Sequence, residues 1–470
     1  MSIIFRNRAI EICMNRFIKT FTILIFSVFL GMLPSYSINN DDVVANQKDA
    51  KTLVTKISYD DVIKKAQEHS YDLKIADFQV LISKQEVRGA RSEYFPKLAF
   101  SAGTEYTKNY RDTKDTQVMA IGESFVNPYT RYQSIMGIML SYNLFDFGVR
   151  KGNLDISKED VLLKELEESQ QLQELNLSIV DTYTKILIAR RQIDLNKEIL
   201  AIEEKNLEMK TRLYNAKEIS KTELNDAIAK VSLIKKRIAD LHSIMSESVN
   251  MLSFYTGEEY DLENLKVEDI KKPNFDTSAF NDYTKTVMWK VHEKKIKKKE
   301  LELKVAKRNN YPKVNAYSRY YMYGSDKSSY PDSLSDFGPS NYTIGASVYM
   351  PVFDGMKNNA LIKKTNLELQ QLHVERDKDI AQYMTRLATM RSNLIYLNEQ
   401  IQENDKISKE LKDKEKSMHK LASKRLISPI EENSAKSEVL ENKIEHEKNL
   451  ATSIAITKAI QILTEENEDK

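Results

Sequence analysis

The residues best suited to chemistry are the six histidines, the single cysteine and the carboxylates of this 470-residue chain. The histidines lack the short spacing of a zinc site and stand at His69, His242, His292, His373, His419 and His446. No glycine-rich phosphate loop is present, and Cys13 precedes an apolar N-terminal run. We therefore expect no catalytic, cofactor-binding or metal-binding residue, no cofactor and no enzymatic activity.

Two short motifs do carry specific hydrogen-bonding chemistry. Ser220-Lys221-Thr222-Glu223 and Ser428-Pro429-Ile430-Glu431 are capping boxes, in which a serine and a glutamate satisfy each other's backbone amides at the start of a helix. The two serines lie 208 positions apart. Each box therefore predicts a helix that starts after a sharp break, and the equal spacing indicates a duplicated unit.

The element that positions the first motif is a long helical stretch, Lys151 to Leu252, broken at residues 215–220. Apolar residues alternate in steps of three and four, which is the seam by which one helix packs along another. Before the break the seam is Leu172, Leu175, Ile179, Thr182, Ile186, Ala189, Ile193 and Leu200; after it the seam is Leu224, Ile228, Val231, Ile238, Met245, Val249 and Leu252, flawed at Lys235 and His242. At about 1.5 Å per residue, the first arm would be a rod roughly 95 Å long.

The whole order of elements occurs twice. A helix, a strand, a loop, a second strand and a long helical hairpin are predicted in each half, with Phe95-Pro96 matched by Tyr311-Pro312 and Phe145-Asp146 by Phe353-Asp354. The predicted domains are a signal peptide (1–37), a lead-in (38–57), a first repeat (58–253), a linker (254–276), a second repeat (277–463) and a tail (464–470). In the first repeat we expect strands at about 97–107 and 134–145 and a helical hairpin at 151–252. In the second repeat we expect strands at about 313–323 and 342–353 and a helical hairpin at 358–463. One helix is expected to run from Ser58 to about Glu93.

The N-terminus is typical of an export signal, since Arg16 and Lys19 precede the apolar run 21–30 and small residues stand at Ser35 and Ser37. A membrane anchor is the alternative, although the run is short for one. The formal charge is +2, so no nucleic-acid partner is expected. The lysine-rich run 294–299 is typical of a solvated helix face, with phosphate contact as the alternative.

The pattern of the four predicted strands indicates whether they lie in a soluble core or in a membrane. In each strand apolar residues alternate with polar ones, yet the helices already use their apolar stripes to pack on one another. Four strands cannot close a barrel, and open edges are not tolerated in lipid. We therefore expect two, three or four chains to share one barrel of 8, 12 or 16 strands in a lipid bilayer, with apolar side chains facing lipid.

The duplication, the aromatic-proline and Phe-Asp motifs and the paired breaks ending in Ile-Ser resemble the TolC-type outer membrane efflux protein family, over residues 58 to 463. The resemblance implies a mostly α fold with a membrane β-barrel: a homotrimer whose chains each contribute four strands to a shared twelve-stranded barrel, prolonged by a periplasmic α-helical barrel. It implies that the helical breaks are periplasmic tips that contact an adaptor protein coupled to an inner-membrane transporter. These tips are Ala216, Lys217, Glu218, Ile219 and Ser220, and Lys424, Arg425, Leu426, Ile427 and Ser428. Glycine is common before the break in the family, whereas Lys217 and Arg425 stand here.

The resemblance also implies acidic rings at the narrow tunnel entrance. Glu431 matches the first ring, Ser434 stands at the second, and Glu432 offers a neighbouring carboxylate. Three chains would bring these carboxylates toward one axis, although Glu431 is equally explained as the capping-box residue.

The leading function is a passive channel-tunnel of a tripartite efflux or type I secretion system in the outer membrane. The alternative is a non-conducting exported coiled-coil stalk. The exported substrate, whether drug, metal or protein, is not specified by these residues.

Overall fold

The computed structural model describes residues 56–108, 120–121, 124–125, 132–273 and 282–464. The predicted signal peptide, the lead-in up to residue 55, the end of the linker and the tail beyond Thr464 lie outside the described residues. The chain divides into residues 1–52 and 53–470, and the second unit contains all the elements that follow.

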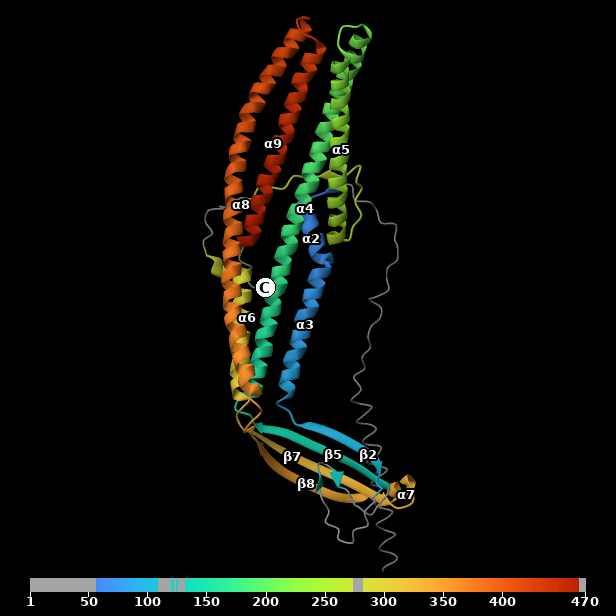
Figure 1. Cartoon of the computed structure of the whole chain (residues 1–470), viewed down its shortest axis with the longest axis vertical. Helices are drawn as coiled ribbons and strands as arrows, with labels where there is room; N and C mark the ends of the chain where they lie inside the picture. Colours follow the sequence, from blue (N-terminus) through green and yellow to red (C-terminus); the bar gives the residue numbers. More distant parts are fainter. Residues whose placement is uncertain (1–55, 109–119, 122–123, 126–131, 274–281, 465–470) are drawn as a thin grey trace, which may run out of the picture. The chain divides into compact units, whose positions relative to one another are not determined.

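The helices confirm the duplicated order. The first repeat contains α3 (Tyr71–Ser92), α4 (Val149–Asn215) and α5 (Lys221–Thr256), and the second contains α6 (Val287–Arg308), α8 (Lys357–Ser423) and α9 (Pro429–Thr464). Their lengths match pair by pair, at 22, 67 and 36 residues. Figure 1 shows both hairpins, α4–α5 and α8–α9, ending at the far end of the helices from the sheet. The duplication is thus exact to the residue in every long helix.

The predicted single helix from Ser58 to Glu93 is wrong in one respect, because it is two helices. α2 (Tyr59–His69) ends at Ser70, whose backbone leaves the helical region at φ −48° and ψ 124°. The same serine caps α3, with its side chain accepting from the Leu73 amide. A serine can end one helix and start the next without glycine or proline, so a break at Ser70 is hard to predict from local sequence.

The helical core follows the predicted seam along α4, where Ile179, Ile186 and Ile193 are fully buried. On α5 the seam takes another path. Ile234 and Leu241 are buried, whereas the predicted Ile228 is exposed. The run Val231, Ile234, Ile238, Leu241 and Met245 keeps the steps of three and four unbroken, so Lys235 and His242 are not flaws in the seam but neighbours of it.

A four-stranded antiparallel sheet has the order β2 (Lys97–Tyr106), β5 (Tyr132–Phe145), β7 (Lys313–Asp326) and β8 (Gly338–Tyr349). Opposite residues such as Phe100, Ile138, Tyr320 and Tyr342 share one face across all four strands. β8 starts and ends about four residues before the predicted strand 342–353, so Met350 and Val352 lie beyond it. In the loops between the strands, three short elements were not predicted: α7 (Tyr330–Ser335), β3 (Ala120–Ile121) and β4 (Ser124–Phe125).

A small parallel pair ties the end of the lead-in to the linker. β1 (Lys56–Ile57) pairs with β6 (Lys266–Val267). The Tyr183 hydroxyl of α4 donates to the backbone oxygens of Ile57 (3.2 Å) and Glu268 (2.8 Å). Tyr183 is fully buried, and this burial raises the pKa of its hydroxyl. The hydroxyl therefore stays a donor and fixes both segments to the long helix.

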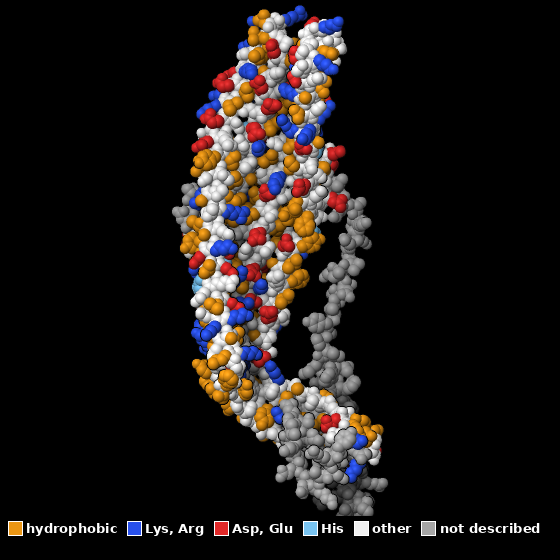
Figure 2. Space-filling model, viewed as in Figure 1, with side chains coloured by type: hydrophobic (Ala, Val, Ile, Leu, Met, Phe, Trp, Pro, Cys, Tyr) orange, Lys and Arg blue, Asp and Glu red, His pale blue; other side chains and the backbone are white. Residues whose placement is uncertain are grey.

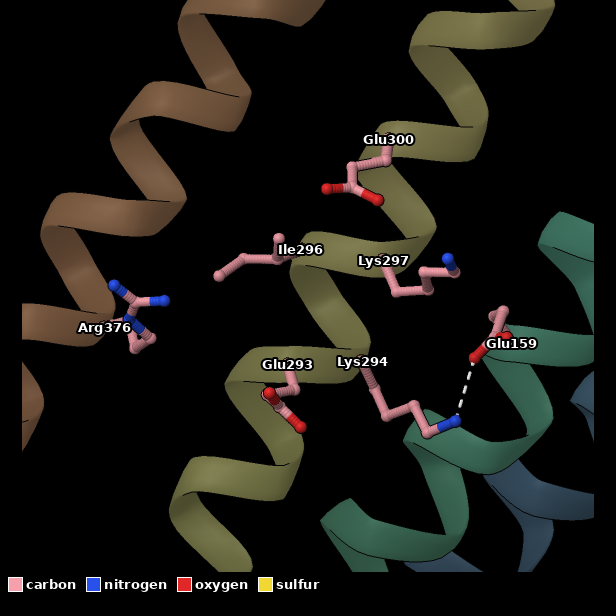
Figure 3. A pocket seen from close by; sticks show the side chains of 7 residues that line it. All are labelled: Glu159, Glu293, Lys294, Ile296, Lys297, Glu300 and Arg376. Carbon is pink, nitrogen blue, oxygen red and sulfur yellow. Dashed lines mark hydrogen bonds and ion pairs between the residues drawn. The ribbon is translucent and has the colours of Figure 1, made fainter. Parts of the chain in front are cut away.

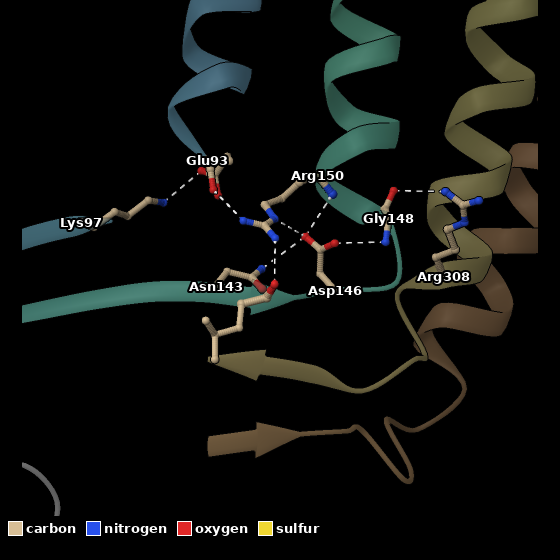
Figure 4. A network of polar contacts seen from close by, with 8 residues as sticks. Glu93, Lys97, Asn143, Asp146, Gly148, Arg150 and Arg308 are labelled. Atoms are coloured by element: carbon tan, nitrogen blue, oxygen red, sulfur yellow. Dashed lines mark hydrogen bonds and ion pairs between the residues drawn. The ribbon is translucent and has the colours of Figure 1, made fainter. Parts of the chain in front are cut away.

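The sheet joins the helices through a polar elbow at the start of α4, shown in Figure 4. The Asp146 carboxylate accepts from the Gly148 and Arg150 amides and from Arg150 Nε, at 3.1, 3.2 and 2.8 Å. Arg308, at the end of α6, donates to the Gly148 oxygen at 3.1 Å. Gly148 has φ +82°, a conformation that favours glycine. The elbow thus links the two repeats where the chain turns from strand to helix.

In the view of Figure 2, charged and apolar side chains alternate over most of the helical surface, and apolar side chains gather where the helices meet the sheet. Among the described helices, none combines the length and the apolar character needed to cross a membrane.

Candidate functional site

The two hairpin tips have the same backbone conformation. Lys217 and Arg425 adopt left-handed φ angles of 63° and 62°. At each tip two amides turn back to close the helix: Lys217 N–H bonds the Tyr214 oxygen and Glu218 N–H the Leu213 oxygen, both at 2.9 Å. The second tip repeats this pattern, with its amides bonding the Ala422 and Leu421 oxygens. This is the helix ending that usually uses glycine, here adopted by two cationic residues.

Both capping boxes form. Ser220 accepts from the Glu223 amide at 3.2 Å, and Glu223 accepts from the Ser220 amide at 3.4 Å. In the second tip, Ser428 accepts from the Glu431 amide at 3.3 Å and Glu431 accepts from the Ser428 amide at 3.1 Å. Each tip is therefore a rigid turn between two capped helices.

The tip surface is cationic with one apolar side chain. Lys217, Lys424 and Arg425 are exposed, as are Ala216, Glu218, Ser220 and Ser428. Leu426 is exposed, while Ile219 and Ile427 are half-buried. An exposed leucine at the apex of a polar turn offers an apolar contact to another protein.

The three predicted gate residues lie in the first turns of α9 and have different surroundings. Glu431 is exposed and is used in the capping box. Glu432 accepts from Lys436 Nζ at 2.7 Å and lies 2.9 Å from His419 Nδ1 on α8. These hydrogen bonds, Lys436 first and His419 second, lower the pKa of Glu432. Ser434 is half-buried.

Sequence reasoning missed a buried polar network next to the tips. The Glu203 carboxylate of α4 accepts from Lys230 Nζ of α5 (2.9 Å), from Asn206 (3.2 Å) and from the Ser437 hydroxyl of α9 (2.9 Å). Asn433 of α9 also donates to Asn206 at 2.8 Å. This Glu203 network joins both hairpins between the apolar seam and the tips.

The ionisation of Glu203 follows from these partners. Burial opposes its charge, but the hydrogen bonds from Lys230, Asn206 and Ser437 outweigh burial and lower its pKa. A signal was present in the sequence. Asn196, Glu203 and Asn206 continue the seam positions of α4 with polar residues, and polar residues at seam positions require partners.

Among the described residues, no group of three histidine, cysteine or carboxylate side chains could hold a metal ion. The candidate site consists of two capped tips next to a polar layer, an arrangement suited to holding helices together and contacting another protein.

Comparison with known proteins gives the family to which this arrangement is similar. The family model for "Outer membrane efflux protein" matches residues 62–258. The predicted resemblance is confirmed. No curated protein matches the chain.

Three solved structures share the fold at low sequence identity. The outer membrane protein VceC of Vibrio cholerae is 14% identical, with a TM-score of 0.67, covering 86% of this chain and 95% of that chain. The CmeC outer membrane channel of Campylobacter jejuni is 15% identical, with a TM-score of 0.69 and 87% of each chain covered. CusC, whose structures concern transmembrane channel formation, is 16% identical, with a TM-score of 0.66, covering 86% of this chain and 91% of that one. The chain therefore has the fold of outer membrane efflux channels.

Proposed function

We propose that this chain is one subunit of a homotrimeric outer membrane channel-tunnel with a periplasmic extension. Three copies would close a twelve-stranded barrel, and the long helices would continue its bore. The channel would conduct substrates passively from a periplasmic adaptor and an inner-membrane transporter of an efflux or type I secretion system.

The observation that carries the proposal is the sheet. Its even-numbered face is apolar and open, with Leu98 70%, Ile344 74% and Val348 70% exposed. The opposite face carries polar residues such as Glu105, Asn315 and Arg319. Four strands with open edges cannot stand alone in lipid, whereas three sets of four reach the size of a closed barrel.

The tips support an adaptor contact and the α9 start supports an entrance. Both tips expose cationic residues, Lys217 on the first and Lys424 and Arg425 on the second, and the second tip also exposes Leu426. We assign Glu431, Glu432 and Ser434 to the entrance, because they lie in the first turns of the helix that leaves the second tip. Glu432 would act there through its pairs with Lys436 and His419.

The experiment is conductance of the purified chain in planar bilayers, with its mass in detergent measured on the same sample. We expect three chains per particle and discrete ion-conducting steps. A water-soluble, non-conducting rod would instead support the coiled-coil stalk.

A further inference from the structure

The internal duplication gives the contacts between copies residue by residue. α3 and α6 correspond at an offset of 216, since Tyr71–Ser92 matches Val287–Arg308, and α4 and α8 correspond at an offset of 208. Within the chain, α6 packs on both α8 and α4, so it has two used faces. α3 has the two corresponding faces. One of them packs on α4, the long helix of its own repeat, and the other is left for a partner outside the chain.

The used face of α3 matches the α8-facing side of α6. Ala76, Val80 and Ser83 are buried beside α4, and their counterparts are His292, Ile296 and Lys299. Two of these counterparts contact α8: His292 lies 3.0 Å from Asp379, and Lys299 donates to Glu368 at 3.1 Å.

The second face of α6 contacts α4 through charged and apolar pairs. Lys294 pairs with Glu159 at 3.0 Å, as Figure 3 shows. Lys298 pairs with Asp160 at 2.5 Å, and Val287 and Val291 pack against Leu163.

The matching face of α3 is apolar and exposed. Tyr71, Ile75, Phe78 and Ile82 stand where α6 has Val287, Val291, Lys294 and Lys298, and all four are more than half exposed. Figure 2 shows apolar side chains gathered along this edge of the helices. The α8 residue that corresponds to Glu159 is Leu367, which is 63% exposed, and Phe78 is 65% exposed. Two exposed apolar residues thus occupy the two positions of one internal ion pair.

A glycine agrees with this mapping. Gly152 on α4 lies so close to α6 that a Cβ would come within 2.4 Å of Val305 Cγ2. The corresponding pair is Ala360 on α8 and Gly89 on α3. Among the described residues, no atom lies within 4 Å of a Cβ added at Gly89. Gly89 lies in the last turn of α3, and a helical glycine that no other element of the chain crowds leaves room for a close helix from a second copy.

We infer that the α3 stripe formed by Tyr71, Ile75, Phe78 and Ile82 packs on α8 of a second copy, with Phe78 on Leu367 and Gly89 on Ala360. This inference rests on the proposed function and gives the contacts that build the trimer. Within the chain the α4–α6 contact uses ion pairs, whereas the contact between chains uses apolar area, which drives the association of separate chains.

The same mapping fixes a strand register between copies. β5 pairs with β7 through Met136 with Met322, Ile138 with Tyr320 and Leu140 with Ser318. Applying the two offsets pairs β8 with β2 of the next copy. The pairs are Ile344 with Tyr106, Ala346 with Thr104 and Val348 with Ala102.

The helix contact is tested by transplanting the internal ion pair. In the full chain extracted in detergent, Phe78→Lys alone and Leu367→Glu alone should each lose most of the trimer. The double variant recreates the Lys294–Glu159 pair and should regain at least half of it at low salt. The matched control is Leu81→Lys, because Leu81 is similarly exposed but corresponds to the exposed Lys297 of α6; it should leave the trimer intact.

Failure of rescue, with the single variants still disrupting the trimer, would overturn the contact and indicate that another surface covers α3. Loss of the trimer in the Leu81→Lys control would also overturn it. Intact trimers in both Phe78→Lys and Leu367→Glu would likewise overturn the contact.

The register is tested with cysteine pairs in a Cys13→Ser background. Oxidation should link Ala102→Cys with Val348→Cys between copies, because opposite Cα atoms lie about 4.5–5.5 Å apart. Ala102→Cys with Ala346→Cys lies two residues out of register, roughly 8 Å apart, and should not link. A conducting trimer that links only the second pair would overturn this register and leave the proposed function standing. A monomer in detergent would overturn both.

Discussion

Replacing Glu203 should destabilise the start of α9 more than replacing any neighbouring carboxylate would. The variant Glu203→Ala removes the acceptor that Lys230, Asn206 and Ser437 share. Lys230 is 48% exposed and can be rehydrated, but Asn206 and Ser437 are buried and would each lose a bond to a charged group. Each lost bond costs about 1–3 kcal/mol, and part of this cost is regained because a charge is no longer buried. We therefore expect the free energy of local unfolding at the start of α9 to fall by about 2–4 kcal/mol in all.

The assay is hydrogen exchange of residues 429–440, measured by mass spectrometry on the assembled protein. Since about 1.4 kcal/mol is a factor of ten, protection should fall roughly 30- to 700-fold. The matched control is Glu204→Ala, which removes a surface pair with Lys235 (2.8 Å, both side chains about half exposed). An exposed pair contributes less than about 1 kcal/mol, so that variant should change protection less than about fivefold. Equal protection in the two variants would refute the reasoning.

The same network predicts a pH dependence. The pKa of Glu203 is lowered in the folded protein, so its contribution is present above the ordinary carboxyl pKa and is lost as pH falls through the lowered value. Glu432 contributes in the same direction, because its pKa is also lowered. Exchange of α9, corrected for its intrinsic rate, should therefore rise on acidification, and Glu203→Ala should show a smaller rise than the parent chain. An identical rise in the exchange rate of the variant and the parent chain would mean that a group other than Glu203 causes the acid sensitivity.

Three further predictions concern the tips, the linker and the entrance. Arg425→Gly should raise the free energy of unfolding by about 0.5–1 kcal/mol, since the φ of 62° costs glycine little, whereas Arg425→Val should lower it; a lower thermal midpoint for the glycine variant would contradict this. Tyr183→Phe should lower the free energy of unfolding by about 1–2 kcal/mol by deleting a buried donor, as measured by denaturant titration, and no change would mean that the two carbonyls find other donors. Glu431→Ala combined with Glu432→Ala should raise single-channel conductance or weaken block by divalent cations, and unchanged conductance and block would leave Glu431 with its capping role alone.

Much of the fold could be predicted because its signals are local and occur twice. The capping boxes at Ser220 and Ser428 fix where α5 and α9 begin, and the proline-containing junctions fix where β2 and β7 start. The break at Ser70 was missed because a serine with no glycine or proline beside it is ambiguous. The end of β8 was misplaced because apolar alternation continues through Met350 and Val352, beyond the last ladder pair at Tyr349.

The candidate site could be predicted only in part. Capping chemistry is local, so Glu431 was found, but the Glu203 network needs three helices that are far apart in sequence. On α5, the sequence does not show whether the stripe with Ile228 or the stripe with Ile234 is buried, because the two apolar stripes differ only in which neighbouring helix each contacts. Long-range packing, and not helix propensity, decides both.

The most direct test of the account is the number of chains per particle in detergent, measured by light scattering or native mass spectrometry with the conductance of the same sample. The account predicts three chains and ion-conducting steps. A single chain that stays dissolved without detergent, with the apolar face of its sheet covered by its own residues, would contradict it.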